Sequence, residues 1–190
     1  TMVLNQGLSA ASRILPIIDQ KNNIIDASDA KPIEIKKSNI KFIDTDFSNS
    51  VGDSKTLNSI NLEFEGGKMT SLVGHSGSGK STIMNLIPRF YEIQSGDILI
   101  DGQSISDVTI SSLRAEISMV SQETTLFDDT IKNNIRYSKL TASDEEITEA
   151  AKLSNCEEFI KKLPNGYETV IGENGIRLSG GEKQRLSVAR

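Results

Sequence analysis

The chain has 190 residues, of which 36% are hydrophobic and 25% are charged, and its formal net charge is −5. This composition is typical of a folded globular protein, and the length suffices for one domain with a substantial core. The acidic balance argues against a surface that binds nucleic acid or anionic lipid, so no nucleic-acid partner is expected. Cys156 is the only cysteine, which excludes a disulfide framework and favours a reducing, cytoplasmic setting.

The first part of the chain is predicted to be a helix followed by a linker. Residues 3–14 carry apolar side chains at helical spacing, and Pro16 is expected to break or kink this helix. The apolar stripe needs a partner, either in the same domain or outside the chain. Residues 19–31 are polar and predict a linker. No apolar run reaches the ~18–20 residues that span a bilayer, so the chain as given is expected to be soluble. Thr1 in place of a starting Met suggests a segment of a longer polypeptide.

Alternating apolar residues then predict a meander of strands. Residues 32–47 form the first such segment, and Leu57 to Phe64 form the second. Residues 49–55, which separate the two, predict a turn. After two glycines, residues 70–73 predict a short buried strand that leads directly into the most informative motif of the chain.

Residues 74–81, Gly-His-Ser-Gly-Ser-Gly-Lys-Ser, match the P-loop pattern G-x-x-x-x-G-K-[ST], which binds nucleotide phosphates. Its glycines allow backbone N–H groups to surround a polyphosphate, and a helix predicted to begin near Gly79 adds the positive end of its dipole. Lys80 supplies a charge for the β- and γ-phosphates, and the Ser81 hydroxyl is placed to bind Mg²⁺. A chance Gly/Ser loop is the alternative, but the predicted strand before the motif and helix after it favour a nucleotide site.

A mixed and then helical region follows the P-loop. The sequence predicts a strand at residues 96–102 and a short helix at residues 110–117. It also predicts a buried strand at residues 118–121 that ends on Gln122. Two polar helical segments come next, and the second has a capping box formed by a serine and a glutamate three residues later. These segments are residues 128–137 and 143–163, with Ser143 and Glu146 as the capping pair.

A second candidate motif lies near the end of the chain, where residues 178–185 read Leu-Ser-Gly-Gly-Glu-Lys-Gln-Arg. Ser179 is a good N-cap, and Gly180 and Gly181 expose backbone N–H groups at the start of a predicted helix. This predicts a second helix start that binds anions. A plain helix N-terminus is the alternative, and the presence of a P-loop earlier in the chain disfavours it.

Together these motifs resemble the ATP-binding cassette of ABC transporters, and residues 178–181 match the signature motif of that family. The resemblance covers nearly the whole chain. Finer features resemble the exporter branch, in particular bacterial lipid-A/phospholipid flippases and multidrug half-transporters. These features are residues 89–91, 96–102, 120–123, 126–127, 135–137 and 172–175.

The resemblance implies an α/β fold, in which a P-loop NTPase core carries an antiparallel β subdomain and a helical insert subdomain. It also implies that the C-terminal part of the core is missing. Residues 1–31 would be a helix and linker from a preceding membrane domain, and residues 32–190 an incomplete ABC ATPase domain. The latter would divide into a β subdomain with the P-loop core, a helical subdomain and the signature helix, at residues 32–121, 122–178 and 179–190.

The implied function is ATP binding and hydrolysis that power the export of a lipid or hydrophobic compound across a membrane. Lys80 and Gln122 would be catalytic, and Ser81 and Gln122 would bind Mg²⁺. The implied nucleotide-binding residues are Gly74, His75, Ser76, Gly77, Ser78, Gly79, Lys80, Ser81, Thr82, Gln122, Ser179, Gly180 and Gly181. The last three would contact the ATP of a second nucleotide-binding domain in a head-to-tail dimer. The domain would lie at the cytoplasmic face of the inner membrane, joined to the membrane domain of the same polypeptide.

Two departures from the family remain. The family stacks adenine on an aromatic residue upstream of the P-loop, but the best register places Asn49 there. Adenine affinity or selectivity is then expected to be weaker unless Phe42, Phe47 or a neighbour substitutes. The family's general base and switch histidine would follow Arg190, so the chain alone is expected to lack hydrolysis. An ABC-type ATPase of DNA repair or translation, and a nucleotide-binding module without hydrolysis, stay open as alternatives.

Overall fold

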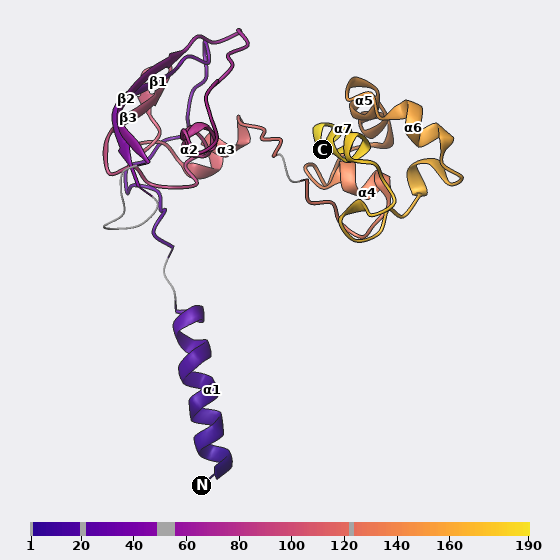
Figure 1. Cartoon of the computed structure of the whole chain (residues 1–190), viewed down its shortest axis with the longest axis horizontal. Helices are drawn as coiled ribbons and strands as arrows, with labels where there is room; N and C mark the ends of the chain where they lie inside the picture. The colour runs from indigo at the N-terminus through magenta and orange to yellow at the C-terminus, as the bar shows by residue number, and fades with distance from the viewer. Residues whose placement is uncertain (1, 20–21, 49–55, 122–123) are drawn as a thin grey trace. The chain divides into compact units, whose positions relative to one another are not determined.

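The computed structural model describes every residue except 1, 20–21, 49–55 and 122–123, and it describes residues 2–6 by their backbone alone. The chain separates into two compact units, Thr1–Ser118 and Met119–Arg190 (Figure 1). The first unit contains α1 (Met2–Ile18), β1 (Ile40–Phe47), β2 (Leu57–Phe64), α2 (Lys80–Leu86), β3 (Ser95–Ile100), β4 (Gln103–Ser104) and α3 (Ile110–Ala115). The second contains α4 (Ile131–Arg136), α5 (Asp144–Leu153), α6 (Glu157–Lys162), η1 (Gly166–Glu168), η2 (Glu173–Gly175) and α7 (Gly180–Ala189).

The sheet of the first unit has four strands in the order β2–β1–β3–β4, and every pair of neighbours is antiparallel. Phe42 at the centre of β1 pairs with Leu62 of β2 and with Ile98 of β3. The strand predicted from Leu57 to Phe64 is therefore confirmed, and the one predicted at residues 96–102 is present as β3 but ends at Ile100, before a turn at residues 101–102. The antiparallel character of this part of the fold, which the alternating pattern favoured, is also confirmed.

The core of the first unit is built by side chains from this sheet, α2 and α3. Its buried members are Phe42, Phe47, Leu57, Ile83, Leu86, Ile98, Ile100, Ile105, Val108 and Leu113. Helix α2 has only seven residues, and a helix this short is not stable by itself in water. Burial of Ile83 and Leu86, roughly 1.5–3 kcal/mol each, therefore holds α2 against the sheet.

The first predicted strand is shorter than the sequence suggested, because β1 begins only at Ile40. Side chains, and not a neighbouring strand, accept the backbone hydrogen bonds of the preceding segment. Ser112 Oγ accepts from the Ile33 N–H at 2.9 Å, and Gln103 Oε1 accepts from the Glu34 N–H at 3.0 Å. These acceptors hold residues 32–39 in an irregular conformation, so the prediction of a strand from residue 32 is wrong.

The buried strands predicted at residues 70–73 and 118–121 are also wrong. Neither segment is a strand, and Val73 and Val120 are 89% and 45% exposed. A strand needs a neighbour to take its backbone hydrogen bonds. Within the part of the chain that the structure describes, no strand pairs with either segment.

Helix α1 confirms the predicted N-terminal helix and continues beyond its predicted end to Ile18. Pro16 lies inside it, and the N–H of Asp19 still donates to the carbonyl oxygen of Leu15 at 2.8 Å. The apolar side chains near its end are exposed, from 52% at Leu15 to 72% at Ile17. Among the residues described, no helix has both the length and the apolar character needed to cross a bilayer.

The second unit is a cluster of short helices around its own core. The capping box of α5 is present as predicted: Ser143 Oγ accepts from the Glu146 N–H, and Glu146 Oε2 accepts from the Ser143 N–H. The single helix predicted at residues 143–163 is two helices, because Asn155 has a left-handed backbone (φ +57°) after α5. The buried core residues are Leu126, Ile131, Ile135, Ile147, Ala151, Cys156, Phe159, Ile160, Ile171, Leu178, Leu186 and Ala189.

Asp101, in the turn between β3 and β4, fixes the segment before β1. Its carboxylate accepts four backbone hydrogen bonds, of 2.7 to 3.0 Å, from the N–H groups of residues 36–39. These bonds stabilise the ionised carboxylate and hold the pKa of Asp101 far below its ordinary value of 3.8, with the bond from Lys36 contributing most. The ionised carboxylate thus accepts the backbone hydrogen bonds of residues 36–39, which a neighbouring strand would otherwise accept.

Asp101→Asn is expected to lower the urea midpoint of unfolding at pH 7, because an amide carries no charge and offers one acceptor oxygen. The folded-state pKa is depressed, so the contribution of Asp101 is fully present well above pH 3.8 and is lost as the pH falls. The gap in midpoint between wild type and variant should therefore narrow below about pH 4. Asp107→Asn, at an exposed carboxylate of the same unit, is the control. A gap of constant size from pH 7 to pH 3 would contradict this role.

Candidate functional site

The predicted P-loop leads directly into α2. Gly79 is the N-cap of the helix and has a left-handed backbone (φ +85°, ψ 5°). Its carbonyl oxygen accepts the first helical hydrogen bond, from the Ile83 N–H at 2.9 Å. The loop-to-helix geometry that the motif predicts is confirmed, while the segment before the loop is not a strand.

Gly79 is the point where the P-loop contacts the sheet. A Cβ atom at this position would lie 2.8 Å from Cδ2 of Leu57, closer than carbon atoms approach. Leu57 is the first residue of β2, is 3% exposed, and pairs with Phe47 at the end of β1. Glycine is strongly favoured here, because the backbone is left-handed and because a Cβ would force the Leu57 side chain to shift. The P-loop therefore packs against the end of the β1–β2 pair.

Lys80 folds back over the P-loop. Its ammonium group donates to the carbonyl oxygens of Gly74 at 2.9 Å and His75 at 2.8 Å, and to Ser78 Oγ at 3.2 Å. No carboxylate among the described residues forms an ion pair with it. The positive charge therefore sits on the loop and faces only neutral oxygens, which leaves it available to a phosphate.

The other P-loop residues form an exposed polar surface. The side chains of His75, Ser76 and Ser81 are exposed, and the His75 ring nitrogen Nδ1 lies 3.1 Å from the Ser76 carbonyl oxygen. The described residues contain no cluster of three or more His, Cys, Asp or Glu that could hold a metal ion by itself. Mg²⁺ takes most of its ligands from water and phosphate oxygens, so the single Ser81 hydroxyl at the helix start fits this ion. Gln122, the other predicted Mg²⁺ ligand, lies outside the described residues.

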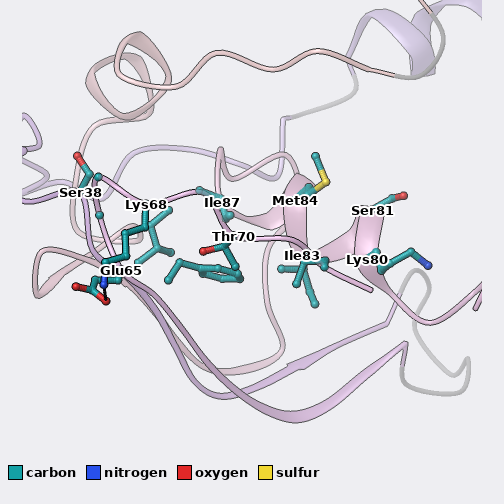
Figure 2. Close-up of a pocket in the computed structure, with 14 residues that line it drawn as sticks. Ser38, Glu65, Lys68, Thr70, Lys80, Ser81, Ile83, Met84 and Ile87 are labelled. Carbon is teal, nitrogen blue, oxygen red and sulfur yellow. Dashed lines mark hydrogen bonds and ion pairs between the residues drawn. The ribbon is translucent and has the colours of Figure 1, made fainter. Parts of the chain in front are cut away.

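A cavity of about 570 Å³ lies beside the P-loop, between α2 and the sheet (Figure 2). Its lining is mostly apolar and includes Ile40, Phe64, Leu72, Ile83, Met84 and Ile87. Lys80 and Ser81 belong to its edge, and the ammonium end of Lys80 points away from the other labelled side chains in Figure 2. The exposed loop backbone, and not this apolar cavity, has the chemistry of a phosphate site.

The second motif forms the helix start that the sequence predicts. Ser179 Oγ accepts from the Glu182 N–H at 3.4 Å, and Glu182 Oε2 accepts at 2.7 Å from both the N–H and the hydroxyl of Ser179. The hydroxyl bond, followed by the backbone bond, lowers the pKa of Glu182. Leu178 before the motif and Leu186 within α7 are buried in the core of the second unit, which fixes the helix.

The capping box of α5 shows what is particular to the start of α7. Both boxes have the same serine and glutamate pair, but Ser143 is followed by acidic residues that complement the helix dipole. Ser179 is followed by Gly180 and Gly181, both exposed, and a Cβ at Gly180 would meet nothing within 4 Å. The backbone N–H groups of α7 are thus left open to an external anion.

The structure brings together the residues of each predicted motif, the P-loop in the first unit and Ser179 to Gly181 in the second. Asn49, at the predicted adenine position, lies outside the described residues. Phe42 and Phe47 are 0% and 2% exposed, so neither can replace an adenine-stacking aromatic. Sequence reasoning did not identify Leu57 as the support of the P-loop, because no motif carries that contact.

Comparison with known proteins now identifies the chain. The profile of the family described as ABC transporter matches residues 57–190. The chain is 48% identical over 187 residues, 98% of its length, to an ATP-dependent lipid A-core flippase of Desulfotalea psychrophila. It is 48% identical over 177 residues, 93% of its length, to a putative multidrug export ATP-binding/permease protein of Staphylococcus aureus.

A solved structure of a bacterial Atm1-family ABC exporter with ATP bound is also similar, with a TM-score of 0.90, 40% identity and 97% of the chain covered. The chain spans 31% to 32% of the length of these three proteins. It belongs to the ABC transporter family, and it has the mixed α/β fold of the ABC ATPase domain with its antiparallel β subdomain. The resemblance and the fold class predicted from the sequence are confirmed.

The contact between Gly79 and Leu57 predicts a difference between two P-loop glycines. Gly77→Ala is expected to cost about 1–2 kcal/mol in the free energy of unfolding, because its φ of +81° is left-handed but its surroundings are open. Gly79→Ala has a similar φ and also the Leu57 clash, so it should cost at least a further ~1 kcal/mol. Urea unfolding of both variants measures this.

Leu57→Ala added to Gly79→Ala provides the control, since it removes the clashing methyl group. The two changes together should cost less than the sum of their separate effects. Equal costs for the two glycine variants, or strict additivity with Leu57→Ala, would contradict the contact.

Proposed function

We propose that this chain is the ATP-binding part of an ABC exporter, in which ATP binding and hydrolysis power export of a lipid or hydrophobic compound across a membrane. The observation that carries the proposal is the P-loop: the Lys80 ammonium faces only neutral oxygens on an exposed loop. The similarity of nearly the whole chain to a lipid A-core flippase and to an export ATP-binding/permease protein supports the transport function.

The P-loop residues act on the phosphates of ATP. Backbone N–H groups of the loop and the Lys80 ammonium bind the β- and γ-phosphate oxygens, and Lys80 offsets the negative charge that develops on them as the γ-phosphate leaves. Ser81 and Gln122 hold Mg²⁺, which neutralises phosphate charge when bound. Gln122 also orients the attacking water.

The second motif acts on a nucleotide bound to another copy of the domain. The open N–H groups of Gly180 and Gly181, with the Ser179 hydroxyl, bind the γ-phosphate held by the P-loop of that copy. A two-fold head-to-tail dimer then contains two ATP molecules, each between a P-loop and a signature motif. Binding of ATP draws the two domains together, and hydrolysis releases them.

The N-terminal helix and linker connect this domain to a membrane domain in the same polypeptide, and the ATPase domain lies at the cytoplasmic face of the membrane. The exposed apolar side chains of α1, among them Leu8 and Ile17, support this, because such a surface requires a partner. An ABC-type ATPase not coupled to transport is the alternative. The coding sequence before α1 distinguishes the two: membrane-spanning helices encoded there would favour the exporter over an ATPase not coupled to transport.

Lys80→Ala is expected to weaken ATP binding by about tenfold to a hundredfold, because a hydrogen-bonded positive charge on the phosphates is lost. It should also abolish ATP turnover by the full exporter. Equilibrium dialysis with labelled ATP and a phosphate-release assay measure the two effects.

Lys68→Ala is the matched control, since Lys68 is an exposed lysine of the same unit that pairs with Glu65 at 2.7 Å. Its removal should leave both binding and turnover near wild type. Unchanged turnover in the Lys80 variant would remove this residue from the proposed role.

A further inference from the structure

At the start of α7 the hydroxyl of the capping serine is itself bound. Ser179 Oγ donates to Glu182 Oε2 at 2.7 Å, and the same carboxylate oxygen accepts from the Ser179 N–H at 2.7 Å. A hydroxyl has a single proton to donate. In the domain by itself this proton is therefore committed to Glu182 and is not offered to an anion outside the helix.

A phosphate at this helix start would need the same proton. Phosphate oxygens accept hydrogen bonds, so the proposed contact of Ser179 with a γ-phosphate is a bond that its hydroxyl donates. The Glu182 carboxylate and the phosphate are thus two acceptors that compete for one donor. Both are anions, and the carboxylate therefore also opposes the phosphate by its charge.

The charge of Glu182 is present at neutral pH and is not neutralised by an ion pair. The hydrogen bond from the Ser179 hydroxyl, followed by that from its N–H, lowers the pKa of this carboxyl. In the part of the chain that the structure describes, Glu182 forms no ion pair, whereas the corresponding Glu146 of α5 pairs with Lys139. The negative charge therefore remains at the helix start where the phosphate is proposed to bind.

The surroundings of Glu182 also provide a place for the carboxylate once it leaves the hydroxyl. The cations that act on it are Arg185 and Lys162, and Lys162 already pairs with Glu158 at 2.7 Å. Arg185 follows Glu182 by one helical turn, and its buried Nε has no hydrogen-bond partner among the described residues. Breaking the bond to Ser179 therefore leaves the carboxylate with a counter-charge nearby.

We propose that Glu182 sets how tightly the signature motif binds the γ-phosphate: its carboxylate holds the Ser179 hydroxyl until a phosphate displaces it, which weakens nucleotide binding between two domains. The proposal rests on the nucleotide-binding function proposed above. Glu182 is then a positioning residue that acts through Ser179. Glutamine at this position would keep the capping box, since its amide oxygen accepts from the Ser179 N–H, but it would remove the charge.

Equilibrium dialysis of the full exporter with a labelled, non-hydrolysable ATP analogue in Mg²⁺ buffer tests this. Glu182→Gln should lower the Kd by about threefold to tenfold, because the hydroxyl then leaves a neutral acceptor more easily than an ionised one. Glu146→Gln makes the same change in the capping box of α5 and should leave the Kd within about twofold of wild type. A role limited to capping the helix predicts no change or a higher Kd in Glu182→Gln.

A double-variant cycle tests whether the effect passes through the hydroxyl. In a Ser179→Ala background no proton is left to compete for, so adding Glu182→Gln should lower the Kd by no more than about twofold. An unchanged or higher Kd in Glu182→Gln alone would overturn the proposal, and so would an equal gain with and without the Ser179 hydroxyl. Analogue binding that Lys80→Ala does not weaken would instead contradict the nucleotide-binding function itself.

Discussion

The P-loop depends on one close contact, between Gly79 at the start of α2 and Leu57 at the start of β2. The absence of a Cβ at Gly79 lets the loop lie directly on the sheet end, and burial of Ile83 and Leu86 keeps the short helix behind it. From this base the Lys80 side chain reaches back over the loop. The end of the β1–β2 pair therefore supports the loop that is proposed to bind phosphate.

The proposed contact of the second motif with a nucleotide depends on backbone N–H groups at the start of α7 that no side chain covers. Most helix N-termini are satisfied by side chains of their own first turn, as at Ser143, where acidic residues follow the cap. At Ser179 the same capping box is followed by Gly180 and Gly181, and the backbone stays accessible. An anion from outside is the natural partner of such a site. In the proposed dimer, a phosphate held by one P-loop would join two domains through this helix start.

Features that depend on a few contiguous residues were predicted correctly from the sequence. The P-loop, the capping box at Ser143, the N-cap at Ser179 and the strand from Leu57 to Phe64 depend on local conformation and alternation, and all are present. The apolar runs at residues 70–73 and 118–121 predicted strands, but a strand also needs a neighbour, which a local pattern cannot show. The irregular segment at residues 32–39 depends on Asp101, far along the chain. Leu57 was missed for the same reason, since its importance lies in a long-range contact and not in a motif.

In the proposed dimer, the nucleotide site is complete only when the P-loop of one copy meets the signature motif of another. Disulfide formation between two differently tagged full exporters, one with Ser76→Cys and the other with Gly180→Cys, measures this directly. Cys156 of this chain is buried, any cysteine outside these 190 residues is replaced by serine, and a side chain at Gly180 meets open space. If ATP joins the two motifs, a covalent product that carries both tags forms only with ATP. No such product, or one that forms equally without ATP, would contradict it.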